Sequence, residues 1–176
     1  MNPHAKRALV TGGSGGLGRA ICRRLVADGH HVIVHGNRSL DKAEAVVTAI
    51  QAAGGSAEAV AFDVTDRAAT AAALETLLAA GPIQILVNNA GIHEDVVFPG
   101  MAAEQWQRVL DVSLNGFFNV TQPLMLPMIR SRWGRVVNVS SIAALTGNRG
   151  QVNYSAAKGA LNAATKSLAL EVASRS

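Results

Sequence analysis

The stretch Thr11-Gly12-Gly13-Ser14-Gly15-Gly16-Leu17-Gly18 decides the fold of this chain. It follows the apolar run Ala8-Leu9-Val10 and leads directly into a helical pattern from Arg19 to Val26. A strand, a glycine turn and a helix N-terminus in this order form a cradle for a dinucleotide pyrophosphate, because glycine lets the backbone approach the anion and unpaired N–H groups attract it. The alternative is a flexible turn that binds nothing.

The glycine spacing fits two motifs. Gly13, Gly15 and Gly18 satisfy G-x-G-x-x-G, the general dinucleotide fingerprint, whereas Gly12, Gly16 and Gly18 satisfy T-G-x-x-x-G-x-G. Neither glycine motif is specific when it stands alone.

The composition is that of one globular domain. The 176 residues are 49% hydrophobic and 16% charged, so we expect a single nucleotide-binding domain over residues 1–176. No apolar run has the length of a signal or membrane-spanning segment, which predicts a cytoplasmic protein without membrane contact. The net charge of +4 favours anionic partners, but the basic residues are scattered and aromatics make up only 4%, so nucleic-acid binding is not supported. The lone Cys22 is expected in the core.

Strand-like and helical runs alternate along the chain. This alternation predicts an α/β fold of the Rossmann type, a doubly wound parallel sheet with helices on both faces. The expected strands are Arg7–Thr11, His31–His35, Ala57–Asp63, Gln84–Asn88 and Arg135–Ser140. The expected helices are Gly16–Asp28, Leu40–Ala53, Arg67–Ala80, one long helix over Ala102–Arg130, and Tyr154–Ser174.

The strand expected at Arg135–Ser140 is apolar enough to need a neighbour on each side, yet no further strand follows it in the sequence. We therefore expect that the C-terminal strands of the fold are missing from the chain as given.

The residues after the second strand predict which cofactor binds. NAD-selective sites carry an acid there for the ribose hydroxyl, but this chain has Asn37-Arg38-Ser39. Arg38 could instead bind a ribose 2′-phosphate, which favours NADP(H), although it could also be an exposed loop arginine. Asp63-Val64 could hold the adenine amino group, or Asp63 could cap the following helix.

Two further groups of residues bear on binding. Asn88-Asn89-Ala90-Gly91 ends the fourth strand, where it could bridge strands and touch the cofactor. His30, His31 and His35 suggest a metal cluster, but neighbouring residues of a strand point to opposite faces and no carboxylate or cysteine completes the set. No metal site is expected.

A serine, a tyrosine and a lysine form the candidate catalytic group. Ser140-Ser141 ends the fifth strand, and Tyr154 and Lys158 form an i, i+4 pair that shares one helical face. An adjacent ammonium favours the phenolate form of a tyrosine, which makes such a pair suitable for proton transfer. Taken alone, Tyr-x-x-x-Lys is more often a chance arrangement on a helix surface.

Together, T-G-G-S-G-G-L-G, N-N-A-G, S-S and Y-S-A-A-K, in this order and spacing, resemble the short-chain dehydrogenase/reductase family over essentially the whole chain. Thr146–Tyr154 and Asn37-Arg38-Ser39 are similar to its 3-oxoacyl-[acyl-carrier-protein] reductase branch. The resemblance implies hydride transfer from NADPH to a ketone in fatty-acid-type biosynthesis. The expected substrate is carried by an acyl carrier protein or another acyl thioester.

The resemblance also implies a role for each matching residue. Ser141 would bind the carbonyl oxygen, Tyr154 would deliver the proton, and Lys158 would bind the nicotinamide ribose. The residues expected to contact NADP(H) are Gly12, Ser14, Gly15, Gly16, Leu17, Gly18, Arg38, Asp63, Val64, Asn89, Tyr154 and Lys158. The family further implies a homodimer or homotetramer through the last two long helices.

The sequence departs from the family pattern in two places. Ser113 stands where the family usually has an asparagine that holds a water of the proton relay, and Asn115 cannot replace it because it faces elsewhere on a helix. Ser113 could still bind a water, so reduced turnover is expected. The chain also stops at Ser176, before the family's substrate loop, so weak NADP(H) binding and poor turnover are expected of it.

Three alternatives remain open from the sequence. Arg132 and Arg175 match basic positions expected near the active-site mouth, where an acidic carrier could dock, or they are ordinary surface charges. The substrate could instead be another alcohol, a sugar or a steroid. The chain could also be a non-catalytic nucleotide-binding subunit.

Overall fold

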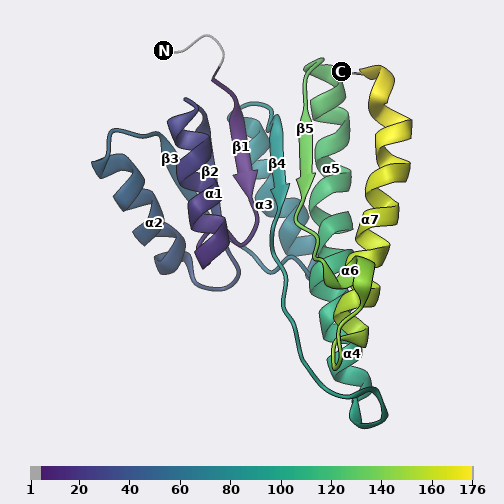
Figure 1. The fold of residues 1–176 in the computed structure, drawn as a ribbon. Helices are drawn as coiled ribbons and strands as arrows, with labels where there is room; N and C mark the ends of the chain where they lie inside the picture. The colour runs from purple at the N-terminus through teal and green to yellow at the C-terminus, as the bar shows by residue number, and fades with distance from the viewer. Residues whose placement is uncertain (1–4, 176) are drawn as a thin grey trace.

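A five-stranded parallel sheet forms the centre of the molecule, with the strand order β3-β2-β1-β4-β5 (Figure 1). The structure is a computed structural model that describes residues 5–175. The strands are β1 (Arg7–Val10), β2 (His31–Gly36), β3 (Ala57–Ala61), β4 (Ile85–Asn88) and β5 (Arg135–Asn138). The strand order reverses between β1 and β4, and open α/β sheets bind ligands beyond the carboxyl ends of their strands at such a point.

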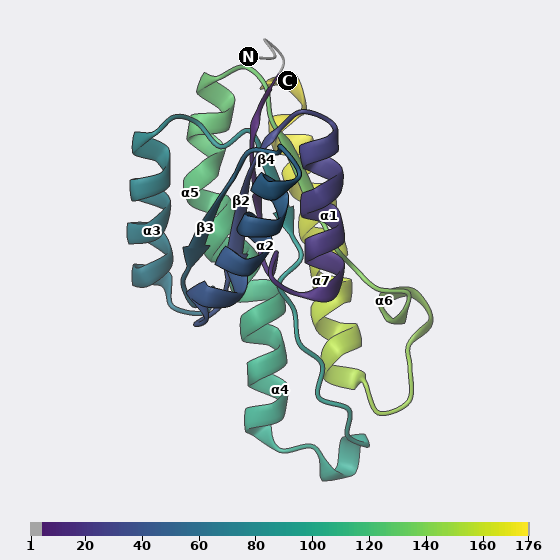
Figure 2. The ribbon, with the colours of Figure 1, turned by 90° about the vertical axis from the view of Figure 1, so that its left-hand side faces the viewer.

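The two faces of the sheet bury separate hydrophobic cores, because alternate side chains of a strand point to opposite faces. Val10 and Val34 pack with α1 (Gly16–Ala27) and α2 (Leu40–Ala52) on one face. Leu9 and Ile33 pack with α3 (Arg67–Ala79) and α5 (Gly116–Arg130) on the other. Figure 2 shows α3 and α5 on one side of the sheet and α1 on the other. This arrangement confirms the predicted doubly wound α/β class.

The long helix predicted over Ala102–Arg130 is divided into two helices. The segment α4 (Ala103–Leu110) is joined to α5 through a turn of π-helix at Asp111–Asn115. A single π turn widens the helix by one residue, and the hydrophobic period does not encode that change. The prediction of one uniform helix was therefore wrong at this turn.

The C-terminal third adds two helices. The longer one, α7 (Val152–Val172), lies beside α5 and ends in a 3-10 turn at Ala173–Arg175 (Figure 1). A four-residue helix, α6 (Ala143–Thr146), packs against α7 and was not predicted. Between residues 5 and 175, no helix is both long enough and apolar enough to cross a membrane.

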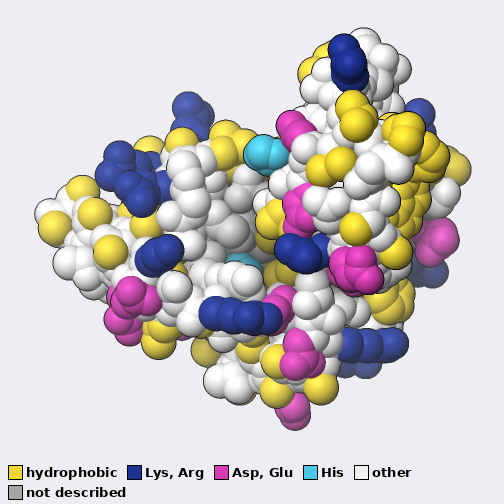
Figure 3. All heavy atoms as spheres, turned by 90° about the horizontal axis from the view of Figure 1, so that it is seen from below, with side chains coloured by type: hydrophobic (Ala, Val, Ile, Leu, Met, Phe, Trp, Pro, Cys, Tyr) yellow, Lys and Arg dark blue, Asp and Glu magenta, His cyan; other side chains and the backbone are white. Residues whose placement is uncertain are grey.

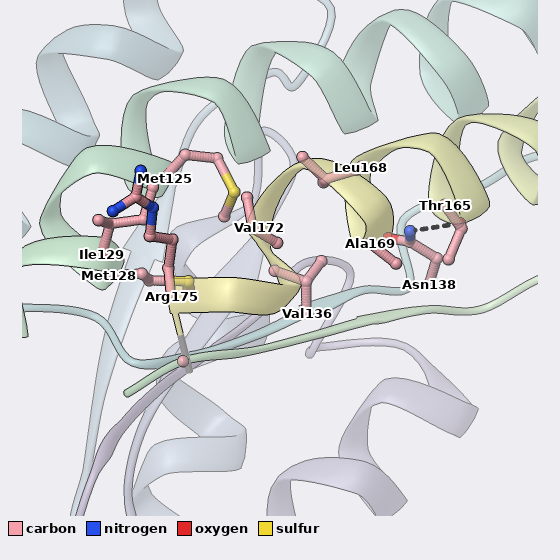
Figure 4. Close-up of a pocket in the computed structure, with 11 residues that line it drawn as sticks. Met125, Met128, Ile129, Val136, Asn138, Thr165, Leu168, Ala169, Val172 and Arg175 are labelled. Atoms are coloured by element: carbon pink, nitrogen blue, oxygen red, sulfur yellow. Dashed lines mark hydrogen bonds between the residues drawn. The ribbon is translucent and has the colours of Figure 1, made fainter. Parts of the chain in front are cut away.

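The strand β5 forms one edge of the sheet. Within residues 5–175 it pairs with β4 only, and Val137 is 51% exposed. Between β5, α5 and α7 lies an apolar hollow of about 170 Å³, lined by Met125, Met128 and Leu168 among others (Figure 4). Asn138 crosses one end of the hollow and donates a hydrogen bond to Thr165 Oγ1 at 2.8 Å. Of the residues described, none of the expected catalytic or cofactor-binding ones lines this hollow, but Arg175 does.

Candidate active site

A cleft of about 400 Å³ opens beyond the carboxyl ends of β1, β2 and β4, where the topology predicts a ligand site. Figure 3 looks onto this edge of the sheet and shows a hollow between two lobes of the surface. The residues that line the cleft are Gly12, Ser14, Gly15, Gly16, Leu17, Gly18, His35, Asn37, Asp63, Val64, Asn89, Ala90, Gly91, Ile92 and Val112. The structure thus brings most of the expected cofactor residues to one cavity.

The glycine loop is held by close backbone packing. Gly12 has a φ of +64°, a conformation that side chains disfavour. A Cβ on Gly18 would collide with the carbonyl group of Gly12, whereas a Cβ on Gly16 would meet nothing within 4 Å. The close contact therefore joins Gly12 and Gly18, which are the outer glycines of the T-G-x-x-x-G-x-G motif.

The helix α1 begins at this loop without the usual side-chain cap. Its N-cap residue is Gly15, which has no side chain to cap the helix, and within the part of the chain that the structure describes its first turn carries no acidic residue. The first N–H groups of a helix have no partner within the helix, so an anion in the cleft could accept from them.

Residues after β4 clamp the loop from the other side. Asn89 Nδ2 donates to the carbonyl oxygens of Thr11 and Gly12 at 3.0 and 3.2 Å. Thr11 Oγ1 in turn accepts from the backbone N–H groups of Asn89 and Ala90, both at 3.0 Å. Neighbouring Asn88 joins β4 to β5 by donating to Asn138 Oδ1 at 2.8 Å. The predicted bridging role of this segment is confirmed.

Arg38 and Asp63 are paired with each other across the rim of the cleft, with Arg38 Nη2 3.0 Å from Asp63 Oδ2. Burial acts to raise the pKa of Asp63, but hydrogen bonds from Thr65 and Arg38 outweigh it and hold the pKa below the usual value. Asp63 does not cap α3, because Asp66 is the residue that accepts from Ala69 N–H. The capping alternative for Asp63 was therefore wrong.

Lys158 lies deep in the site. Its side chain is buried, and Nζ donates to the carbonyl oxygen of Val139 at 2.8 Å. Burial lowers the pKa of this ammonium group. A Cβ on Gly91 would lie 3.4 Å from Lys158 Nζ and 3.8 Å from Ser113 Oγ, so the lysine and the serine approach the same point.

Ser113 faces inward from the π turn. Its hydroxyl is buried with no hydrogen-bond partner among the described residues, and it borders a cavity of about 10 Å³. Asn115 is exposed and donates to Asp111 Oδ1 at 2.6 Å, so it points away from this cavity, as expected.

The start of α7 is fixed by the segment that follows β4. Gln151 donates to Asp95 at 3.0 Å, and the fully buried Asn153 donates to the carbonyl oxygens of Glu94 and Gln105. Tyr154 is half-buried, and its ring lies edge-on to His93 with 6.4 Å between the ring centroids.

Ser141 lies where β5 gives way to α6. Its Oγ accepts from Ala143 N–H at 3.2 Å, which leaves its own hydrogen free to donate. Ser141 lies two residues before α6, and α6 packs against α7, the helix that carries Tyr154.

Comparison with known proteins identifies the family. The short chain dehydrogenase family model matches residues 6–176. A 3-oxoacyl-[acyl-carrier-protein] reductase FabG from Aggregatibacter actinomycetemcomitans is 44% identical over 95% of this chain and 70% of its own length. An acetoacetyl-CoA reductase from Acinetobacter sp. is 43% identical over 94% of this chain and 68% of its own length. The chain belongs to the short-chain dehydrogenase family.

The cleft of this short-chain dehydrogenase fits a dinucleotide. The close contact between Gly12 and Gly18 and the uncapped start of α1 leave backbone N–H groups for a pyrophosphate. Two residues have roles that the sequence did not predict: His35, considered only as a metal ligand, lines the cleft, and Asn153 fixes the start of α7. Both are polar residues in otherwise buried positions, but burial depends on the tertiary fold and was not evident from spacing.

The expectation that Arg132 and Arg175 lie near the active-site mouth was wrong. Arg132 lies in the loop before β5 and Arg175 in the 3-10 turn after α7, and these segments are at the opposite end of the molecule from the start of α7, which carries Tyr154 (Figure 1). In a parallel sheet the loops that precede strands lie at the edge opposite to the carboxyl ends. These arginines therefore do not flank the cleft of their own chain.

Proposed function

We propose that this short-chain dehydrogenase is an NADPH-dependent reductase that converts a 3-oxoacyl thioester, carried on acyl carrier protein, to the 3-hydroxyacyl form. The observation that carries the proposal is the approach of buried Lys158 to the glycine-loop cleft, on the helix that also bears Tyr154. The names of several relatives support the substrate class.

NADPH would lie along the glycine loop, with its 2′-phosphate at Arg38 and its adenine near Asp63 and Val64. When bound, it supplies the hydride for the carbonyl carbon. Arg38 is available for a phosphate because its present pair with Asp63 is exposed to solvent, and such pairs are weak. A phosphate offers Arg38 stronger, charge-assisted hydrogen bonds.

Ser141, Tyr154 and Lys158 would act on the proton side of the reaction. Ser141 holds the substrate carbonyl oxygen with its free hydroxyl hydrogen, and Tyr154 gives its phenolic proton to that oxygen as negative charge develops there. Lys158 stabilises the resulting phenolate by its charge. Because burial lowers the pKa of Lys158, the lysine is also disposed to pass on a proton.

Ser113 would complete the route by which Tyr154 regains its proton. Its hydroxyl approaches the same point as Lys158, and the adjoining cavity has about the size that one water molecule needs. We propose that Ser113 holds such a water. A serine hydroxyl is a shorter group than the asparagine amide of the family pattern, so slower turnover is the expected consequence.

Two thioester carriers are candidates. Acyl carrier protein is favoured by the reductases that match this chain, and coenzyme A is favoured by the acetoacetyl-CoA reductase among them. A homodimer or homotetramer is part of the proposal as well. The two carriers are distinguished by measuring NADPH oxidation with an acetoacetyl group on acyl carrier protein and on coenzyme A. The carrier with the higher kcat/KM is the physiological class.

The function is tested with Tyr154→Phe, which removes the phenolic hydroxyl and keeps the ring. We expect NADPH binding within about twofold of wild type and a fall in kcat of at least about 100-fold, because proton transfer is lost while the cofactor contacts remain. As a control, the Kd of NADPH for Tyr154→Phe is measured in the absence of substrate, to show that the cofactor still binds. Undiminished turnover by Tyr154→Phe would refute the assignment of the proton donor, and a wild-type chain that binds NADPH without reducing either thioester would favour a non-catalytic nucleotide-binding subunit.

A further inference from the structure

His35 is a buried histidine at the floor of the cleft whose two ring nitrogens both have partners. Nδ1 accepts from the backbone N–H of Gly12 at 3.0 Å, and Nε2 lies 2.8 Å from the carbonyl oxygen of Phe62. The residue is 1% exposed, and its ring packs on the Phe62 ring with 4.2 Å between centroids. The roles assigned to the glycine loop, Arg38 and Asp63 do not explain why a histidine with two hydrogen bonds is buried at this position.

The partners of the ring determine its chemical form. A backbone N–H can only donate, so Nδ1 must carry a lone pair, and a carbonyl oxygen can only accept, so Nε2 must carry the hydrogen. The neutral ring with its hydrogen on Nε2 is the one form that satisfies both contacts. Burial lowers the pKa of His35, which favours this neutral form, although the hydrogen bond to Phe62 and the charge of Asp63 act in the opposite direction.

His35 joins three segments of the cofactor cleft. Its ring holds Gly12 of the glycine loop, and its own carbonyl oxygen accepts from Ser14 N–H at 3.3 Å. Through Phe62 it also holds the end of β3, directly before Asp63. In the sequence, His35 lies three residues before Arg38. The same side chain therefore connects the loop that would bind the pyrophosphate with the residues that would bind the adenosine end.

We propose that His35 is a positioning residue for the dinucleotide, which acts by holding Gly12 and thereby the glycine loop at a fixed place relative to the end of β3. This inference rests on the proposed binding of NADP(H). Because the pyrophosphate is common to both nicotinamide cofactors, His35 must affect NADPH and NADH alike. Arg38, in contrast, would affect NADPH alone.

Two substitutions each keep one hydrogen bond of the His35 ring and remove the other. His35→Asn places an amide oxygen near the position of Nδ1, so it keeps an acceptor for Gly12 and loses the contact with Phe62. His35→Gln reaches farther and places an amide nitrogen near the position of Nε2, so it keeps the contact with Phe62 and loses Gly12. The Asn side chain is also smaller than the ring and leaves a larger cavity, so it should lower stability more than Gln does.

The two variants separate positioning from a merely structural role because affinity and stability should change in opposite order. We expect His35→Gln to raise the Kd of NADPH and of NADH about tenfold, the upper range for one lost hydrogen bond, and His35→Asn to stay within about threefold of wild type. We expect His35→Asn nevertheless to have the lower Tm. The matched control is His31→Gln, which alters a histidine on the same strand that contacts Ser56 and Glu58 away from the cleft, and should leave both Kd values unchanged.

Cofactor binding is measured by the fluorescence of NADPH and NADH, and Tm by calorimetry. If wild type binds neither nucleotide, the proposed function and this inference both fail. If wild type binds and His35→Asn binds as weakly as His35→Gln, or both bind like wild type, this inference alone fails.

A measurement on the wild-type chain keeps the test open to refutation if either variant does not fold. In a 15N-labelled sample, NMR should show the His35 hydrogen on Nε2 and a scalar coupling between Gly12 N and His35 Nδ1 across their hydrogen bond. A hydrogen on Nδ1 instead would overturn the inference.

Discussion

Arg38 offers the most direct test of how this chain would select its cofactor. The substitution Arg38→Ala removes the guanidinium group from the rim of the cleft. Its pair with Asp63 is 82% exposed on the arginine side, so breaking that pair costs no more than about 1 kcal/mol. Each charge-assisted hydrogen bond to a phosphate contributes about 1.5–3 kcal/mol. The difference leaves a net contribution of roughly 0.5–2 kcal/mol to the binding of a 2′-phosphate.

That difference sets the expected result. Because about 1.4 kcal/mol corresponds to a factor of ten, Arg38→Ala should raise the Kd of NADPH roughly 2-fold to 30-fold. The Kd of NADH should change by less than about twofold, since NADH has no 2′-phosphate. The preference should also weaken as salt is added, because Arg38 is exposed and salt screens exposed charges.

The assay is titration of each nucleotide into wild type and variant at two salt concentrations. Arg23→Ala is the matched control, because Arg23 is also an exposed arginine but lies on α1, whereas Arg38 follows Asn37 of the cleft lining. If Arg38→Ala weakens the binding of NADPH and NADH equally, or weakens neither, Arg38 does not bind the 2′-phosphate.

Three further outcomes are expected. Gly18→Ala should lower stability by about 1–3 kcal/mol because its Cβ meets the Gly12 carbonyl, whereas Gly16→Ala should leave the Tm nearly unchanged because its Cβ meets nothing; equal Tm values from calorimetry would contradict the loop packing. Ser113→Asn should turn over faster than wild type in a steady-state assay; a substantially slower variant would show that serine suits this position. The free energy of unfolding should decrease as the pH falls below about 6.5, because the unfolded chain then takes up a proton on His35 that the folded chain, with its lowered pKa, does not; denaturant titrations of wild type and His35→Gln should show a weaker decrease in the variant.

Much of the fold followed from local patterns. The strands begin and end within about three residues of the predicted positions, because runs such as Ala8-Leu9-Val10 are apolar on both sides, as buried parallel strands require. Gly29 and Gly54 have positive φ directly after the predicted helix ends at Asp28 and Ala53, as is common where helices stop. Features of this kind depend on neighbours in sequence and can be identified without tertiary structure.

The features that the sequence did not predict depend on contacts between distant segments. The π turn at Asp111–Asn115 keeps the same apolar period as an ordinary helix on either side, so nothing local distinguishes it. The pairing of Arg38 with Asp63 joins the segments that follow β2 and β3, at positions 25 residues apart in the sequence. Arg132 was misplaced because its match to a basic family position does not tell at which edge of the sheet it lies.

The π turn contains both Ser113, which faces the lysine, and Asn115, which lies two residues on and faces elsewhere as it would in any helix. The hydroxyl of Ser113 points inward, to within reach of the point that Lys158 approaches, and Asn115 is bound to Asp111 at the surface. An asparagine at position 113 would extend into the cavity of about 10 Å³ that the serine leaves free. The local backbone and the size of that side chain therefore act together, so Ser113→Asn would change the proposed proton route without changing the turn that presents it.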